Sequence, residues 1–75
     1  MHLKPDTQLL DFLSQIKKCS SEVYFETSEG DCLALRSSLS QYIFCSLANQ
    51  PSLLQSGTIR PESKKDLPLL EEFLE

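Results

Sequence analysis

The fold is decided by residues 22–35, which read EVYFETSEGDCLAL. In the first half, Val23 and Phe25 fall on one side of an extended chain, while the glutamates and the tyrosine fall on the other. The cluster Ser-Glu-Gly-Asp that follows is typical of a turn, because Gly30 can adopt a positive φ without steric cost. Residues 32–35 then return as a second strand, so the stretch predicts a β-hairpin.

A helix is expected on each side of this hairpin. The first covers residues 6–18 and begins with Asp6 or Thr7 as its N-cap. The second covers residues 38–48 and is capped by Ser37 or the serine after it. Each helix carries apolar residues at intervals of three and four, which would line one face. These stripes are Leu9, Phe12, Leu13 and Ile16 in the first helix, and Leu39, Tyr42, Ile43 and Leu47 in the second.

The last third of the chain predicts a short strand and a final helix. The strand covers residues 58–60 and stops at Pro61, which cannot donate to a sheet and favours an edge position. The final helix has two possible starts. Ser63 as the cap would put Pro68 inside the helix, whereas Asp66 puts that proline in the first turn, where no N–H is needed. Asp66 is therefore the expected N-cap.

The order helix, strand, strand, helix, short strand, helix predicts an α+β fold. Residues 1–75 would form a single domain, because one core usually organises a chain of this length. The architecture expected is a two-layer sandwich, with helices on one face of a small antiparallel sheet.

The composition excludes several functional classes. Seven Lys and Arg residues against eleven Asp and Glu residues give a net charge of −4, so the chain lacks the basic surface that grips nucleic-acid phosphates. A membrane span needs a run of about 20 apolar residues, and the sequence has none. The first six residues do not resemble a secretory signal, which favours the cytoplasm. No group of residues has the pattern of a catalytic centre, so we expect neither an enzyme nor a cofactor.

The cysteines predict neither disulfides nor a metal site. Cys19, Cys32 and Cys45 are odd in number and form no Cys-x-x-Cys pair, and the only histidine is His2. We therefore expect three reduced thiols that behave as small apolar residues.

Residues 37–59 contain no charged side chain. One interpretation is a helix largely in the core, followed by a polar loop. The other is an exposed helix whose neutral face docks on an unidentified protein partner or on a second copy, because interface centres are depleted of charge. Leu39, Tyr42 and Phe44 are then the interface residues, and Phe44 is the most telling because it lies off the apolar stripe. The small size of the chain also favours association, since a core this small gains from oligomerisation.

Several residues resemble the histidine-containing phosphocarrier protein (HPr) family of the bacterial sugar phosphotransferase system. A Leu-Lys-Ser tripeptide or a similar one opens the second helix of that family after a hairpin, and this chain has Leu-Arg-Ser at residues 35–37. The family's His-x-Arg-Pro-x-Thr loop resembles residues 2–7, His-Leu-Lys-Pro-Asp-Thr. The resemblance implies an HPr-like fold that lacks a full first strand. It implies His2 as a phosphoacceptor and Ser37 as a site of regulatory phosphorylation.

The chain also resembles a set of short proteins from gut Firmicutes. They share the hairpin of residues 22–31, the sequence LRSSLSQY of residues 35–42 and an acidic C-terminal helix rich in Leu and Phe. Some of them carry the label poly(A) polymerase. Nucleotidyl transfer needs paired carboxylates beside a Gly-Ser loop to hold metal ions and phosphates. The acids near the hairpin surround a turn without such a loop, so we do not expect that activity.

Together these observations predict a non-enzymatic interaction or regulatory domain with an HPr-like fold. The alternative is a divergent phosphocarrier that uses His2.

Overall fold

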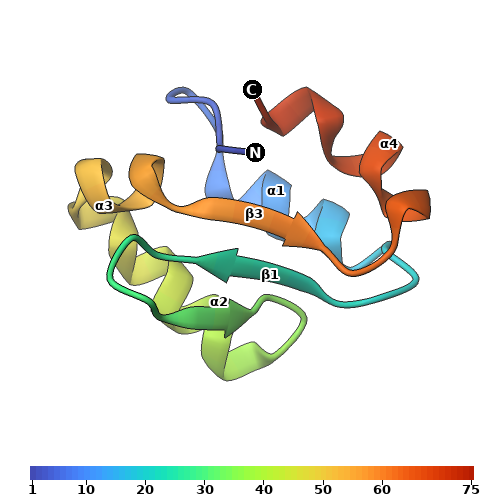
Figure 1. Cartoon of the computed structure of the whole chain (residues 1–75), viewed down its shortest axis with the longest axis horizontal. Coiled ribbons are helices and arrows are strands. Elements are labelled where there is room, and N and C mark those ends of the chain that lie inside the picture. Colours follow the sequence, from blue (N-terminus) through green and yellow to red (C-terminus); the bar gives the residue numbers. More distant parts are fainter.

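A three-stranded antiparallel sheet in the order β2-β1-β3 runs through the middle of the molecule (Figure 1). The strands are β1 (Val23–Glu26), β2 (Cys32–Ala34) and β3 (Thr58–Pro61). The computed structural model describes residues 1–75 apart from the side chain of Ala48. Central β1 places Phe25 between Leu33 of β2 and Ile59 of β3. The predicted hairpin is confirmed, and Gly30 in its turn has a φ of 96°.

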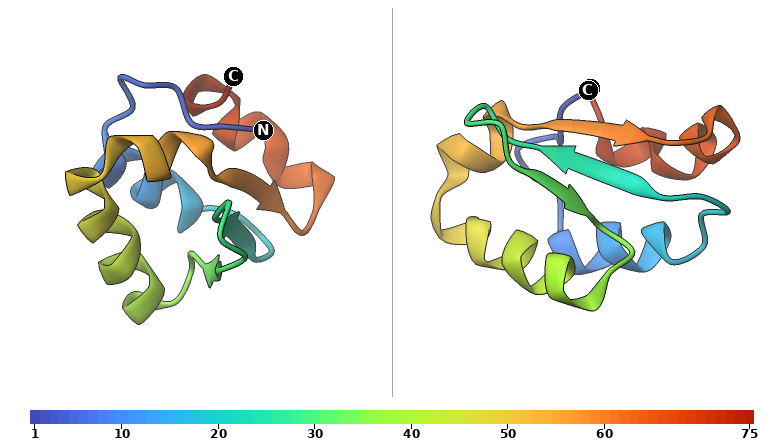
Figure 2. Two further views of the ribbon diagram at one scale, coloured as in Figure 1. Left: turned by 60° about the vertical axis from the view of Figure 1, so that its left-hand side comes forward. Right: turned by 60° about the horizontal axis from the view of Figure 1, so that its bottom comes forward.

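Helices cover one face of this sheet. The helical segments are α1 (Leu9–Ile16), α2 (Ser38–Ser46), α3 (Pro51–Ser56) and α4 (Leu67–Leu70), with short 3-10 turns at η1 (Leu47–Asn49), η2 (Lys64–Asp66) and η3 (Glu71–Phe73). Figure 2 shows α1 and α2 together beneath the sheet, and α4 near its β3 side. The predicted α+β class and two-layer arrangement are confirmed. The strand after α3 also occupies the predicted place at the sheet edge.

Three phenylalanine rings join the two layers. Phe12 of α1, Phe25 of β1 and Phe44 of α2 have no exposed surface. The ring of Phe44 lies 6.0 Å from that of Phe12 and 5.1 Å from that of Phe25, centroid to centroid. Burying each ring stabilises the fold by roughly 1.5–3 kcal/mol, and tilted ring pairs add about 0.5–1.5 kcal/mol. This cluster fixes how α1 and α2 sit against β1.

The N-cap predicted for α1 is wrong. The cap position belongs to Gln8, and its side chain makes no capping hydrogen bond. Residues 4–7 form a turn instead, in which the backbone N–H of Thr7 donates to the carbonyl of Lys4. The hydroxyl of Thr7 donates to the backbone carbonyl of Phe73 at 3.3 Å, so this hydroxyl ties the start of α1 to the C-terminal segment.

Both predicted starts of the last helix are used. Ser63 caps the 3-10 turn η2, and its side chain accepts a hydrogen bond from the backbone N–H of Lys65. Asp66 takes the N-cap position of α4, as predicted. Its buried carboxylate bonds elsewhere, since it accepts hydrogen bonds from Ser20 N, Ser20 Oγ and Ser21 N at 2.9, 3.0 and 3.1 Å. Asp66 therefore links α4 to the loop between α1 and β1.

The two ends of the chain pair with each other. His2 and Glu75 exchange backbone hydrogen bonds, and Leu3 forms an antiparallel bridge with Leu74. The carbonyl of Met1 also accepts from the backbone N–H of Ile59 at 2.7 Å, which places the first residues along β3. The outer edge of β3 is thus partly covered by the N-terminal segment.

Candidate functional site

The candidate site lies on the outward side of α2. Leu39, Tyr42 and Ile43 are 69%, 76% and 40% exposed, and we call these three residues the α2 outer face. They lie at spacings of three and four, so they share one side of the helix. Only two other large apolar residues among those described are comparably exposed, Met1 and Leu10. The α2 outer face is therefore the main apolar cluster on the described surface.

Phe44 is not an interface residue, and the prediction that placed it there is wrong. It is completely buried, whereas the residues of the predicted apolar stripe, apart from Leu47, are exposed. The helix buries Phe44 because this ring completes the three-ring cluster and has no polar atom to desolvate. On the inward side Gln41 satisfies its amide by donating Nε2 to the carbonyl of Leu35 at 2.9 Å. The outward side carries the tyrosine hydroxyl, which can remain in water.

A cleft of about 290 Å³ lies beside the α2 outer face. Its apolar lining comes from the hairpin and from the helices that follow it. The lining residues are Leu33, Ile43, Leu47 and Leu53, with Thr27, Asp31 and Cys32 at the polar side. We call this the hairpin cleft. Ile43 belongs to both features, so the cleft and the α2 outer face form one continuous surface.

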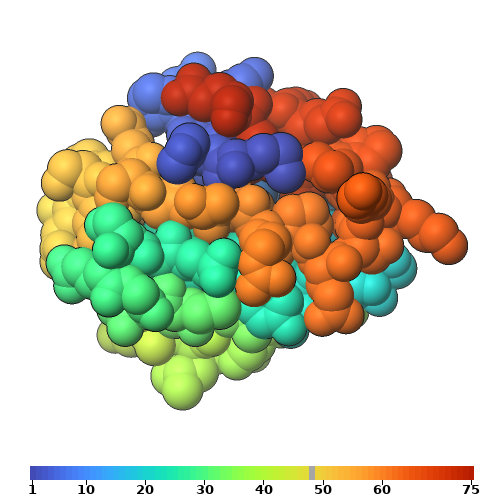
Figure 3. Space-filling model, in the orientation of Figure 1, coloured from blue at the N-terminus to red at the C-terminus, as the bar shows by residue number. Residues whose placement is uncertain are grey.

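The surface is prominent in shape and neutral in charge. In Figure 3 the yellow-green atoms of α2 project beyond the green atoms of the hairpin. The uncharged residues 37–59 include all of α2 and α3, so the only charged residue that lines the hairpin cleft is Asp31. The uncharged stretch of residues 37–59 thus contains the exposed apolar residues of the α2 outer face.

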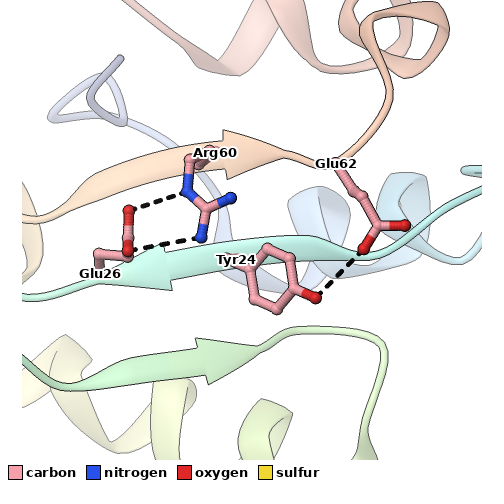
Figure 4. A network of polar contacts seen from close by, with 4 residues as sticks. All are labelled: Tyr24, Glu26, Arg60 and Glu62. Atoms are coloured by element: carbon pink, nitrogen blue, oxygen red, sulfur yellow. Dashed lines mark hydrogen bonds and ion pairs between the residues drawn. The ribbon is translucent and has the colours of Figure 1, made fainter.

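The opposite face of the sheet is polar and internally paired. Arg60 binds Glu26, with Nε 3.1 Å from Oε1, and its guanidinium lies 4.8 Å from the ring centre of Tyr24 (Figure 4). The Tyr24 hydroxyl donates to Glu62 at 3.2 Å. That hydrogen bond to a carboxylate favours the neutral phenol and raises the pKa of Tyr24. Because these groups already satisfy one another, this face is a poorer docking surface than α2.

His2 and Ser37 lie at two separate places. The exposed ring of His2 donates from Nδ1 to the carbonyl of Gly57 at 2.7 Å, next to the start of β3. A carbonyl can only accept, so this bond fixes the proton on Nδ1 in the neutral ring. Ser37 occupies the N-cap position of α2, but its side chain makes no capping bond. The structure does not bring these two candidate phosphoacceptors together.

The start of α1 is acidic. A shallow hollow of about 530 Å³ at this end is lined by the carboxylates of Asp6, Asp11 and Glu72 and by one cation, Lys4. Three carboxylates against one ammonium group disfavour a phosphate here, although a helix N-terminus alone would attract one.

The cysteines take three different environments. Cys19 is buried, Cys45 is half-buried and Cys32 is exposed, and all three are free thiols. Burial is the main cause that raises the pKa of the Cys19 thiol. Within the described residues, no group of three or more His, Cys, Asp or Glu side chains could hold a metal ion. None of the described helices is long and apolar enough to cross a membrane.

The sequence indicated Leu39 and Tyr42 but missed the hairpin cleft. Leu33 and Leu53 belong to β2 and α3, which precede and follow α2 in the chain, and no spacing within one element predicts that they meet. One signal for an exposed apolar surface was present in the sequence, because α2 has two apolar sides. A helix at the edge of a two-layer fold can bury only one of them, so the other must be exposed. A scan against protein-family models found no match, and searches of curated proteins and of solved structures found no significant relative.

Proposed function

We propose that this chain is a cytoplasmic protein-interaction domain, without enzymatic activity, that docks through the α2 outer face and the hairpin cleft. The observation that carries the proposal is the exposure of Leu39, Tyr42 and Ile43 side by side. An apolar cluster next to a concave apolar surface is typical of interaction sites.

The chemistry of the surface supports this function. Tyrosine is among the residues that most often dominate binding energy, because its ring buries a large apolar area and its hydroxyl tolerates water. Tyr42 is 76% exposed and lies on the same side of α2 as the two aliphatic side chains. Burying a side chain of this size in a partner contributes roughly 1.5–3 kcal/mol. The absence of charge in residues 37–59 lowers the desolvation cost of the same contact.

We propose further that the domain has an HPr-like arrangement without a working phosphocarrier site. Two observations support this view over the alternative that uses His2. Nδ1 of His2 donates to the carbonyl of Gly57, and the charged residues that line the hollow at the start of α1 are three acids and one lysine. Phosphoenolpyruvate with Enzyme I of the phosphotransferase system should therefore give no acid-labile adduct on His2. An adduct that His2→Ala abolishes would favour the alternative.

Photo-crosslinking tests the interaction function directly. Tyr42 is replaced by p-benzoylphenylalanine, and the protein is irradiated in the cells that naturally produce it. Leu10 of α1 receives the same replacement as a matched control, because it is 74% exposed but lies on another helix. We expect covalent adducts from position 42 and none from position 10. No adduct at position 42, or equal adducts at both positions, would overturn the proposal.

A further inference from the structure

The two edges of the sheet differ in what they offer to another strand. On β3, the outward N–H of Ile59 already donates to Met1, and Pro61 has no N–H. Both are devices that keep an edge from pairing with other chains. The β3 edge is therefore closed to a further strand.

The β2 edge is open. Leu35 N donates to the carbonyl of Val23, and Thr27 N donates to the carbonyl of Asp31. The odd-numbered residues of this hairpin strand therefore direct their backbone N–H and carbonyl groups toward β1. Because backbone groups alternate along an antiparallel strand, Cys32 and Ala34 direct theirs away from β1. The carbonyl of Ala34 accepts from Ser37 N at 3.0 Å. Among the described residues, the N–H and carbonyl of Cys32 and the N–H of Ala34 have no partner and remain available on this edge.

An apolar surface, formed by α2 and the hairpin cleft, lies alongside the open edge. In Figure 1, α2 projects past β2 on the side away from β1. The hairpin cleft lies between the two elements, since its lining includes Leu33 of β2 and Ile43 of α2. A strand that paired with β2 would thus have main-chain partners on one side and the α2 outer face beneath it. Its side chains on the helix side would point into the cleft.

The charges around this edge select among possible strands. Asp31 lines the hairpin cleft, and the exposed Glu29 lies in the same turn. Among the described residues the only ion pair joins Arg60 and Glu26, so Asp31 has no cationic partner within the chain. A positive side chain near the turn would therefore complement this end of the groove.

We propose that the chain binds an extended peptide segment of a partner protein, which adds as a strand to β2. One apolar side chain of the peptide fills the hairpin cleft, and a lysine or arginine two residues along, on the same face of the added strand, approaches Asp31. This is strand addition, in which main-chain bonds give affinity and pockets for alternate side chains give specificity. The inference rests on the proposed interaction function and names the class of partner. A second copy fits less well, because its own projecting α2 would enter the space already occupied by α2.

Selection from a phage-displayed library of short random peptides tests this inference. We expect the enriched peptides to combine a large apolar residue with a lysine or arginine two residues away. Synthetic versions should shift the amide resonances of residues 31–34 and 39–43 in NMR spectra. A version with an N-methyl group on the residue that faces Cys32 should bind about tenfold more weakly, since it loses the main-chain hydrogen bond to the Cys32 carbonyl.

Two variants and a control locate the contact. Cys32→Pro removes an outward N–H that has no partner within the described chain, at the first residue of an edge strand where proline is tolerated. Asp31→Lys reverses the charge at the cleft. Each should weaken binding about tenfold, whereas Glu71→Lys, an exposed acid-to-base change in η3, should leave it unchanged. If Cys32→Pro does not fold, Asp31→Lys and the N-methylated peptide carry the test.

The remaining outcomes separate this inference from the proposed function. No enriched peptide, or equal binding to Cys32→Pro, overturns strand addition. Enrichment of amphipathic helical peptides that perturb only α2 also overturns it but keeps the interaction function. An adduct from position 42 that proves to be a second copy of the chain likewise overturns the binding of a partner's peptide and keeps the interaction function. Absence of any adduct from position 42 removes the interaction function itself.

Discussion

Gly57 lies directly against the ring of Phe25, so close that a Cβ on residue 57 would overlap the ring carbons Cζ and Cε1. Residue 57 ends α3 and precedes β3, and Phe25 is at the centre of the sheet. The absence of a side chain at this point lets the α3–β3 junction pack onto the core. It also leaves the carbonyl of Gly57 where His2 can reach it.

Gly57→Ala should destabilise the fold by about 1–3 kcal/mol, because the added methyl group forces the ring or the backbone to move. Chemical denaturation measures this loss. The same change in a Phe25→Leu background should cost less, since the smaller side chain leaves room for the methyl group. Equal costs in the two backgrounds would show that the ring contact is not the cause.

Phe44→Ala should destabilise the fold strongly, whereas Tyr42→Ala should leave its stability almost unchanged. Phe44 is fully buried between two other rings, so its truncation should cost about 3–5 kcal/mol. Tyr42 is 76% exposed, so its truncation should change the free energy of unfolding by no more than about 0.5 kcal/mol. Denaturant midpoints at constant m-value measure both. A large loss for Tyr42→Ala would contradict the orientation of α2.

Asp66 should make stability depend on acid pH. The hydrogen bond from the backbone N–H of Ser20 is the main cause that lowers the pKa of this carboxyl, and the two other bonds act in the same direction. Its contribution to stability is therefore present above the unfolded pKa of about 3.9 and is lost as the pH falls through the lower folded value. Thermal melts between neutral and strongly acid pH should show Asp66→Asn less stable than the native chain at neutral pH, with the two curves converging in acid. Glu71→Gln, a change at an exposed acid, is the control. A gap between native chain and Asp66→Asn that stays constant with pH would contradict this role.

The Tyr24 hydroxyl should titrate at lower pH once Glu62 is neutral. The carboxylate of Glu62 accepts the phenolic proton at 3.2 Å and so raises the pKa of Tyr24. In a Tyr42→Phe background only Tyr24 gives a tyrosinate signal, because the chain has two tyrosines. Ultraviolet titration should then show that Glu62→Gln lowers the pKa of Tyr24. An unchanged or higher pKa would mean that the hydrogen bond does not persist in solution.

Local patterns in the sequence predicted the elements, and contacts between distant residues decided what remained. The alternation at Val23 and Phe25 and the turn at Gly30 specify the hairpin without help from the rest of the chain. The orientation of α2 could not be read in the same way, because both of its sides are apolar and the choice depends on rings from α1 and β1. Thr7 is one of the two N-caps that the sequence predicts for α1, the other being Asp6, and its hydroxyl contacts the C-terminal segment instead.

The candidate site follows the same division. Leu39 and Tyr42 were indicated because the absence of charge is visible in the sequence. The hairpin cleft and the open β2 edge were not indicated, since both depend on how the hairpin lies over α2 and α3.

The pairing of His2 with Glu75 has a consequence for how the domain can be held. Both ends of the chain leave the molecule on the side away from α2 (Figure 1). An anchor, a label or a neighbouring polypeptide joined to either end would therefore be attached on the side of the domain opposite α2. The α2 outer face and the open edge of β2 would then be presented to the surroundings whichever end carried the tether.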